Sequence, residues 1–236
     1  MPNRQTALVT GASRGIGRAT ALRLARTHDV VAVARSEEEL DALAAEVAAA
    51  GGRCQTVTVD VADARAVAEA LDGLDVDVLV NNDGVGTLKP LLELTPEEWH
   101  RMVDVNFNAL YHVTRAVLPG MIRREAGHVV MIGSIAGRSA FVGGSCYAAT
   151  KHAVMGFAEC LMLEVRDAGV RVSVVNPGSV DTHFSDRHRD TAWQLVADDV
   201  AAAVEYVVAS PPGVLVHRVE VRALSPKRPR GEQPSP

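Results

Sequence analysis

Short runs of apolar, β-branched residues alternate along this chain with longer runs that have helical spacing. The strand-like runs cover residues 7–9, 30–33, 56–61, 76–80, 129–132, 170–175 and 214–221. The helical runs between them cover residues 18–26, 37–50, 64–71, 97–115, 147–167 and 197–209. Strands that alternate with helices indicate a parallel sheet with helices on both faces, because each parallel connection needs a crossover. The nearly continuous apolar character of the strands agrees with burial on both sides. The sequence therefore predicts an α/β fold.

The chain is long enough to form one such domain. It has 236 residues, of which 47% are hydrophobic, so wholesale disorder is excluded. We expect a single domain over residues 1–224. Residues 225–236 read SPKRPRGEQPSP and are too polar and rich in proline to pack a core, which predicts a flexible Pro/Arg-rich tail. A role of this tail in docking a partner stays open.

Charge, aromatic content and cysteine spacing exclude several classes of function. The net charge of -5 and the 4% of aromatic residues argue against a nucleic-acid partner. No apolar run approaches the length of a membrane span, and the amino-terminal residues do not resemble a signal peptide. The three cysteines include no C-x-x-C pair, so neither a disulfide framework nor a metal site is expected. The resulting prediction is a cytoplasmic protein without a membrane partner.

A glycine-rich segment lies between the first predicted strand and the first predicted helix. Glycines permit a tight turn and close approach of the backbone to a pyrophosphate, and the helix N-terminus offers free N–H groups to its charge. The spacing is G-x-x-x-G-x-G rather than G-x-G-x-x-G, and a glycine cluster alone can mark only a turn. Its position between a strand and a helix nevertheless predicts a dinucleotide site. The expected site residues are Gly11, Ser13, Arg14, Gly15, Ile16 and Gly17.

The end of the second predicted strand indicates which dinucleotide this site prefers. A site for NAD(H) usually has an acidic residue there, which binds the ribose 2′-hydroxyl. This chain instead has Arg35, whose guanidinium could pair with a 2′-phosphate, and Arg14 could reach the same group. Two solvated surface arginines are the alternative interpretation. NADP(H) is therefore the expected cofactor and NAD(H) the less favoured one. Asp60 and Val61, after the third strand, could accept a hydrogen bond from its adenine amino group.

A tyrosine and a lysine lie four residues apart in a chain that has only three of each. Tyr147 and Lys151 share one face of the predicted helix. An ammonium beside a phenol favours the phenolate and lowers the pKa of the tyrosine, which suits acid–base work on a carbonyl–alcohol pair. Ser134 ends the fifth strand, where a hydroxyl could donate to a substrate oxygen. A surface Tyr/Lys pair and a turn serine are the alternatives.

Taken in order along the chain, these motifs resemble those of the short-chain dehydrogenase/reductase (SDR) family in its compact, single-domain, NADP-dependent form. The resemblance rests on TGASRGIG, NNDG, Asn106, Ser134, Tyr147-x-x-x-Lys151 and Asn176-Pro177-Gly178, and it covers residues 5 to about 223. It implies a Rossmann-type, doubly wound, seven-stranded parallel sheet of order 3-2-1-4-5-6-7. It also implies a homodimer or homotetramer. The implied function is an oxidoreductase that transfers a hydride between the nicotinamide and a carbonyl or secondary alcohol of a small molecule.

The resemblance assigns a role to each residue of the expected site. Tyr147 would act as general acid/base, Lys151 would lower its pKa and bind the nicotinamide ribose, and Ser134 would orient the substrate oxygen. Asn106 would anchor a water molecule in a proton relay to Lys151, although by itself it could equally be a capping or buried polar residue. The other cofactor contacts would come from Asn82 on the adenosine side and from Pro177, Gly178, Ser179, Val180 and Thr182 around the nicotinamide.

One position departs from the pattern of the family. The loop after the fourth strand usually reads Asn-Asn-Ala-Gly in the family, whereas this chain has Asn81-Asn82-Asp83-Gly84. An extra carboxylate close to a pyrophosphate would be repelled unless it were turned away or hydrogen-bonded. The exchange is tolerated if Asp83 accepts local backbone hydrogen bonds, as aspartate does in turns. Otherwise it alters how the cofactor is bound, and both interpretations stay open.

The loop over the strand ends is expected to select the substrate. Residues 181–193 (DTHFSDRHRDTAW) form a short, polar candidate lid. Arg187 and Arg189 could attract an anionic substrate or could be solvated surface residues. His183 and His188 have no partners at metal-ligand spacing, so no metal is expected there.

A second class of function is compatible with the same fold. A cofactor-sensing or scaffolding protein could keep the dinucleotide site and have little or no turnover. Such a protein would be expected to lose one of the three catalytic candidates, and all three are present. The enzyme is therefore the favoured prediction.

Overall fold

Seven parallel strands form the centre of the computed structural model, which describes residues 4–182, 193–211 and 213–225. Their order is β3-β2-β1-β4-β5-β6-β9, and a separate two-stranded sheet consists of β7 and β8. The strands are β1 (Thr6–Thr10), β2 (Asp29–Ala34), β3 (Cys54–Thr58), β4 (Val78–Asn81), β5 (Gly127–Ile132), β6 (Val170–Pro177), β7 (Val180–Asp181), β8 (Leu195–Val196) and β9 (Arg218–Val221). The predicted Rossmann-type order is therefore confirmed, with β9 as the seventh strand of the main sheet.

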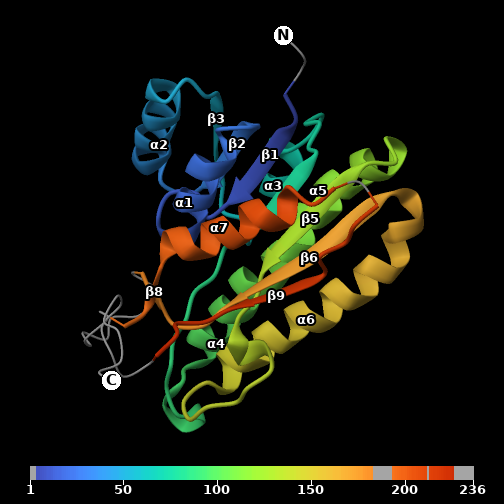
Figure 1. The fold of residues 1–236 in the computed structure, drawn as a ribbon. Helices are drawn as coiled ribbons and strands as arrows, with labels where there is room; N and C mark the ends of the chain where they lie inside the picture. The colour runs from blue at the N-terminus through green and yellow to red at the C-terminus, as the bar shows by residue number, and fades with distance from the viewer. Residues whose placement is uncertain (1–3, 183–192, 212, 226–236) are drawn as a thin grey trace, which may run out of the picture.

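Helices cover both faces of this sheet (Figure 1). They are α1 (Gly15–Leu24), α2 (Glu37–Ala49), α3 (Ala64–Ala70), α4 (Pro96–Val103), α5 (Ala109–Arg123), α6 (Ser145–Val165) and α7 (Ala197–Val208). Successive strand residues point to opposite faces, so each strand contributes to two hydrophobic cores. In β1, Leu8 packs in the core beneath α3, α5 and α6, whereas Ala7 and Val9 pack in the core beneath α1, α2 and α7. This double burial explains why the strands are apolar at nearly every position.

Two of the differences between the structure and the predicted elements concern the last strand of the main sheet and the helix before α5. The predicted strand 214–221 is shorter, because Gly213 adopts a positive φ of 80° and pairing with β6 starts only at Arg218. The predicted helix 97–115 consists of α4, a π-helical segment (Asp104–Asn108) and α5. The helix begins at Pro96, one residue before the predicted start, and Thr95 and Glu98 form a capping box there.

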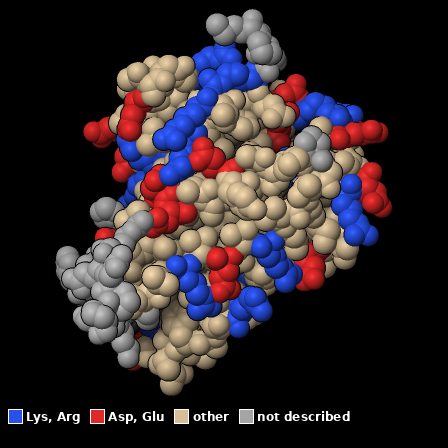
Figure 2. Space-filling view, viewed as in Figure 1, with Lys and Arg blue, Asp and Glu red and all other residues tan. Residues whose placement is uncertain are grey.

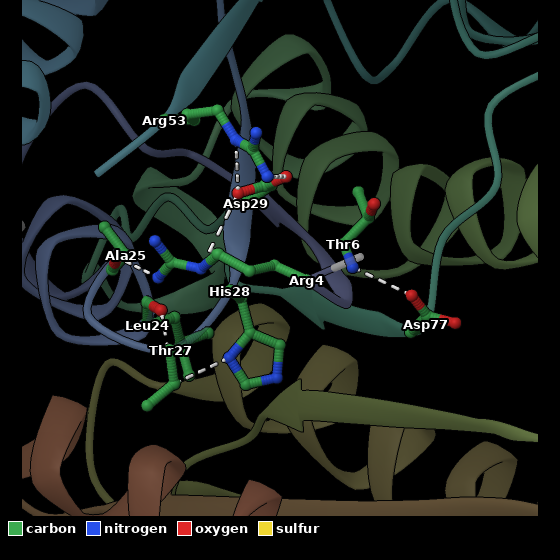
Figure 3. A network of polar contacts seen from close by, with 9 residues as sticks. All are labelled: Arg4, Thr6, Leu24, Ala25, Thr27, His28, Asp29, Arg53 and Asp77. Carbon is green, nitrogen blue, oxygen red and sulfur yellow. Dashed lines mark hydrogen bonds and ion pairs between the residues drawn. The ribbon is translucent and has the colours of Figure 1, made fainter. Parts of the chain in front are cut away.

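A network of charged side chains joins the amino-terminal ends of the strands (Figure 3). Asp29 at the start of β2 pairs with Arg53 at 2.6 Å and with Arg4 at 3.7 Å. The carboxylate of Asp77 accepts the backbone N–H of Thr6 at 2.8 Å. All strands of the main sheet are parallel, so this network lies at the edge opposite to the glycine turn. It stabilises the scaffold and leaves the carboxyl edge free for a site.

The surface of the described residues carries mixed charge. On the face that Figure 2 shows, Lys and Arg side chains are intermingled with Asp and Glu side chains, and broad areas have neither. None of the helices in the described ranges is long and apolar enough to cross a membrane. Most of the predicted lid, including Arg187, Arg189, His183 and His188, lies outside the described residues, and so do residues 226–236 of the predicted tail.

A buried histidine in β5 predicts how stability depends on pH. The Nε2 atom of His128 lies 2.8 Å from the hydroxyl of Ser173, which itself donates to the carbonyl oxygen of Val216. Nε2 must therefore carry the hydrogen, and Nδ1 is buried without a partner among the described residues. Burial, together with the positive charge of Arg171, lowers the pKa of His128 to about 3. The folded state therefore excludes a proton that the unfolded state binds below a pH of about 6.5.

Stability is expected to fall as the pH drops below this value, by about 2 kcal/mol between pH 7.5 and pH 5 from His128 alone. In His128→Gln this part of the pH dependence should be lost. Urea unfolding of both proteins at the two pH values measures the difference. His100→Gln, at an exposed position of α4, is the matched control and should keep the wild-type dependence. Equal pH dependence in wild type and His128→Gln would contradict the prediction.

Candidate active site

The glycine turn joins β1 to α1 at the carboxyl edge of the sheet, beside the point between β1 and β4 where the strand order reverses. Ligands of open α/β sheets bind at this point. Gly11 and Gly15 have φ values of 61° and 56°, in the left-handed region that L side chains rarely adopt. A Cβ atom on Gly17 would lie 2.2 Å from the carbonyl oxygen of Gly11. The turn is therefore held in a conformation that only glycine permits at these positions.

Two residues from β1 and the loop after β4 hold this turn in place. The Asn82 Nδ2 atom donates to the carbonyl oxygens of Thr10 at 3.0 Å and Gly11 at 3.3 Å. The Thr10 hydroxyl accepts the backbone N–H groups of Asn82 at 3.0 Å and Asp83 at 3.3 Å. Asn82 thus supports the cofactor loop from the protein side, a role that the sequence analysis did not assign. The role of Thr10 was missed as well, because bonds over more than 70 residues leave no local pattern.

The start of α1 fits the phosphate groups of a dinucleotide. No side chain caps this helix, and its first turn has no acidic residue, so its free N–H groups can donate to an anion. Ser13 lies half-buried in the turn, and Ile16 packs against the core that contains α1. The Cγ2 atom of Thr182 lies 3.6 Å from the position of a Cβ on Gly15. The structure therefore brings the glycine turn and Thr182, which are far apart in the sequence, to one place.

Arg14 and Arg35 flank the same edge. Both side chains are exposed, and neither forms a hydrogen bond or ion pair with any residue that the structure describes. Arg35 directly follows β2, and no acidic residue stands at the end of that strand. Two exposed guanidinium groups without a hydrogen bond or ion pair to the described residues fit a ligand with an additional phosphate. This edge therefore suits NADP(H).

The predicted adenine contacts lie after β3. The Asp60 carboxylate accepts the backbone N–H of Ala62 at 3.0 Å and lies 3.5 Å from the guanidinium of Arg101. The carbonyl oxygen of Val61 lies 3.2 Å from the imidazole Nδ1 of His112. Both residues already have protein partners, so an adenine would share these groups. Their role toward adenine stays a prediction.

Ser134 follows β5 at the same edge and is nearly buried. Its backbone N–H donates to Asn176 Oδ1 at 3.1 Å, and its Oγ accepts the N–H of Ala136 at 3.1 Å. Gly133 permits this arrangement, since a Cβ there would lie 2.2 Å from Asn176 Oδ1. The hydrogen of the Ser134 hydroxyl is left to donate, and this hydroxyl forms a hydrogen bond with Tyr147. In the sequence Asn176 stands out only as part of the Asn-Pro-Gly motif, and its role in positioning Ser134 was not predicted.

Tyr147 and Lys151 lie on α6 and face the end of β5. The Lys151 Nζ atom donates to the carbonyl oxygen of Ile132 at 2.9 Å and lies 6.0 Å from the centre of the Tyr147 ring. Lys151 is only 4% exposed, and burial lowers its pKa to about 8. The structure therefore brings Ser134, Tyr147 and Lys151 together, as the helical spacing predicts.

The predicted direction for the pKa of Tyr147 is wrong in this structure. Burial raises the pKa of Tyr147, and the hydrogen bond with Ser134 lowers it only in part. The expected effect of Lys151 is weak because its Nζ atom is directed to Ile132 and remains 6.0 Å from the ring centre. At neutral pH the tyrosine therefore holds its proton.

Asn106 lies in the π-helical segment between α4 and α5. Its Nδ2 atom donates to the carbonyl oxygen of Val85 at 3.0 Å and to the Thr150 hydroxyl at 3.2 Å, and its Oδ1 accepts the N–H of Val85 at 2.8 Å. The side chain thus holds the loop after β4 against α6. Its partner on that helix, Thr150, directly precedes Lys151. The predicted water anchor at Asn106 stays a prediction, and π-helical segments are frequent at functional sites.

The last group of predicted cofactor residues follows β6. Pro177 ends that strand, and the backbone N–H of Gly178 donates to the carbonyl oxygen of Val221 at 2.7 Å. The backbone carbonyl oxygen of Ser179 accepts the N–H of Leu195 at 3.1 Å, and Val180 pairs with Leu195 in the small sheet. These contacts direct the chain back toward Thr182 and the glycine turn.

Comparison with known proteins agrees with this geometry. Residues 5–193 match the family described as short chain dehydrogenase. The NADP-dependent 3-hydroxy acid dehydrogenase YdfG of Salmonella typhi is 36% identical over 237 residues, which cover 92% of this chain and 94% of that protein. A metagenomic short-chain oxidoreductase in complex with NADP is 36% identical with a TM-score of 0.83, and the match covers 93% of this chain and 97% of that one. An alcohol dehydrogenase from Thermococcus sibiricus, complexed with 5-hydroxy-NADP, is 32% identical with a TM-score of 0.87 over the same shares.

Proposed function

Since the chain belongs to the short chain dehydrogenase family, we propose that it is an NADP(H)-dependent oxidoreductase that acts on a carbonyl or secondary alcohol of a small molecule. The observation that carries the proposal is the cluster of Ser134, Tyr147 and Lys151 at the carboxyl edge of the sheet, beside the glycine turn. Relatives whose names include NADP support the assignment of NADP(H) as the cofactor. The family resemblance also supports assembly as a homodimer or homotetramer.

The residues of the cluster have different roles toward the substrate oxygen. When bound, the nicotinamide supplies or accepts the hydride. In the reducing direction Tyr147 gives its proton to the carbonyl oxygen, and in the oxidising direction it takes a proton from the alcohol. Ser134 donates its hydroxyl hydrogen to the substrate oxygen, because its Oγ already accepts the N–H of Ala136. A Tyr147 that holds its proton at neutral pH suits the reducing direction.

The relatives guide the choice of substrates for an assay. The Salmonella typhi relative is named as a 3-hydroxy acid dehydrogenase, and the Thermococcus sibiricus protein as an alcohol dehydrogenase. The purified protein should therefore be tested with NADP+ on small 3-hydroxy acids and on neutral secondary alcohols, and with NADPH on the matching carbonyl compounds. Turnover of one class supports the proposal and names the substrate class. Tight binding of NADPH without turnover of any of them would favour the cofactor-sensing protein instead.

The preference for NADP(H) predicts the effect of removing Arg35. The guanidinium is exposed and has no partner among the described residues, so its charge is available to a 2′-phosphate. A hydrogen bond to a charged group contributes about 1.5–3 kcal/mol, so Arg35→Ala should weaken NADPH binding by roughly tenfold to a hundredfold. The affinity for NADH, which lacks the phosphate, should stay unchanged. Fluorescence titration with each cofactor measures both values.

The control for this titration is another exposed arginine on the same half of the sheet. Arg26 follows α1 and lies away from the carboxyl edge, so Arg26→Ala should bind both cofactors as the wild type does. Equal loss of NADPH and NADH affinity in Arg35→Ala would contradict recognition of the phosphate. A wild-type protein that prefers NADH would overturn the assignment of the cofactor but would leave the proposed reaction intact.

A further inference from the structure

Asp83 lies half-buried in the candidate active site, with its Oδ2 atom turned into the protein. Asp83 follows β4, between Asn82, which supports the glycine turn, and Gly84. The Thr10 hydroxyl forms a hydrogen bond with this carboxyl group, whereas the Oδ2 atom is buried without a partner among the described residues. A buried carboxylate oxygen without a hydrogen bond is costly, so its position needs a compensating interaction.

A small cavity on one side of Asp83 is lined by further polar groups. Asp83, Asn81, Asn106 and Thr10 contribute to its wall, together with apolar side chains from α5 and its surroundings. The Asn81 Oδ1 atom is also buried without a partner among the described residues. The cavity has a volume of about 10 Å³, which is close to the space that one water molecule needs.

The other neighbour of Asp83 is the buried ammonium of Lys151. A Cβ atom on Gly84 would lie 3.8 Å from Lys151 Nζ and 3.7 Å from Asn106 Oδ1, so this loop passes directly over the lysine. Lys151 Nζ donates to the carbonyl oxygen of Ile132, which also lines the cavity. Within the described ranges no carboxylate forms a direct ion pair with Lys151. Asp83 is the charged group that opposes the loss of its proton.

We propose that Asp83 is a positioning residue of the active site whose carboxylate keeps Lys151 in its charged ammonium form. The inference rests on the proposed function, in which Lys151 belongs to the cluster with Ser134 and Tyr147. Among the described residues Asp83 forms no hydrogen bond with Ser134, and we assign its effect to the lysine. Asp83, which replaces the usual alanine of the family's loop, thus serves to keep Lys151 charged in this chain.

The charges around Asp83 define the pH range of this effect. Four charged residues interact with it electrostatically: Arg35 after β2, Asp60 after β3, Arg101 on α4 and Lys151 on α6. Burial raises the pKa of Asp83 to about 6, against the effects of Thr10 and the two arginines, and Asp60 adds to the increase. Asp83 is therefore charged above this pH, and Lys151 is charged below a pH of about 8. Both charges are present together between these two values.

The titration of Lys151 can be measured directly, because the chain has only three lysines, Lys89, Lys151 and Lys227. Protein labelled with 13C at lysine Cε gives three signals, and Lys151→Met identifies the one of interest. In Asp83→Asn, which keeps the shape and the acceptor for Thr10, the titration midpoint of Lys151 should move to lower pH by about one unit. Asp83→Ala, which restores the usual residue of the family, should give the same direction.

The control variant removes a carboxylate of equal charge elsewhere. Asp72 is exposed beyond α3, and Asp72→Asn should leave the midpoint of Lys151 unchanged. An unchanged midpoint in both Asp83 variants would overturn the inference, and so would an equal change in Asp72→Asn, since the cause would then be net charge. Urea unfolding confirms that the variants are folded. The titration of Lys151 can be measured without turnover. If the protein had no activity but the midpoint still moved in the Asp83 variants, the proposed function would be rejected and the effect of Asp83 on Lys151 would stand.

Discussion

Replacement of Tyr147 by phenylalanine is expected to lower kcat by about 10²–10⁴-fold, the usual contribution of a positioned general acid or base. The substitution removes only the hydroxyl, which forms a hydrogen bond with Ser134, and keeps the ring that lies 6.0 Å from the Lys151 ammonium. The binding of NADPH should change little, because the glycine turn and Arg35 are untouched. Steady-state kinetics with the best substrate of the panel, together with fluorescence titration, separate the two effects.

The chain offers a matched control for this experiment. Tyr206 lies on α7 with 64% of its surface exposed, so Tyr206→Phe removes a hydroxyl of the same kind away from the cluster. It should keep the wild-type kcat and NADPH affinity. If Tyr147→Phe retained wild-type turnover, Tyr147 would not be the acid/base and the proposed mechanism would be wrong. If it lost NADPH binding together with turnover, the tyrosine would act chiefly on the cofactor.

The fold could be predicted because its main signals are local. Runs of apolar residues marked the strands of the main sheet, since each strand alternates between the two cores, as Leu8 and Val9 do. The helical run from residue 97 placed the start of α4 within one residue of Pro96, where Thr95 and Glu98 form a capping box. The two-residue strands β7 and β8 were missed, because such short strands have no periodicity. The π-helical segment was missed since hydrogen-bond spacing within a helix does not change its apolar pattern.

The candidate site could be predicted only where its residues form short patterns. Tyr147 and Lys151 are four residues apart, and the glycines lie within one turn, so spacing alone identified them. The support of the site by Asn82, Thr10 and Asn176 depends on contacts between distant parts of the chain, which no local pattern records. The pKa of Tyr147 was predicted in the wrong direction for the same reason, because spacing does not reveal burial.

Replacement of Gly17 by alanine is expected to destabilise the fold and to impair cofactor binding together. The added Cβ would lie 2.2 Å from the Gly11 carbonyl oxygen and 2.5 Å from Asn82 Nδ2, so the backbone of the turn must move. Overpacking of this kind costs about 1–3 kcal/mol in the free energy of unfolding. The same movement displaces the N–H groups at the start of α1, so NADPH affinity should fall by at least about tenfold.

Gly156 provides the matched control, because it lies on α6 with no atom within 4 Å of a Cβ built on it. Gly156→Ala should stabilise the helix by up to about 1 kcal/mol, since alanine favours the helix over glycine, and should leave NADPH affinity unchanged. Urea unfolding and NADPH titration of the two variants therefore distinguish close packing at the turn from a general effect of alanine. Wild-type NADPH affinity in Gly17→Ala would show that the turn adapts to a side chain, and the close approach of Gly17 to Gly11 would then have no role in binding the cofactor.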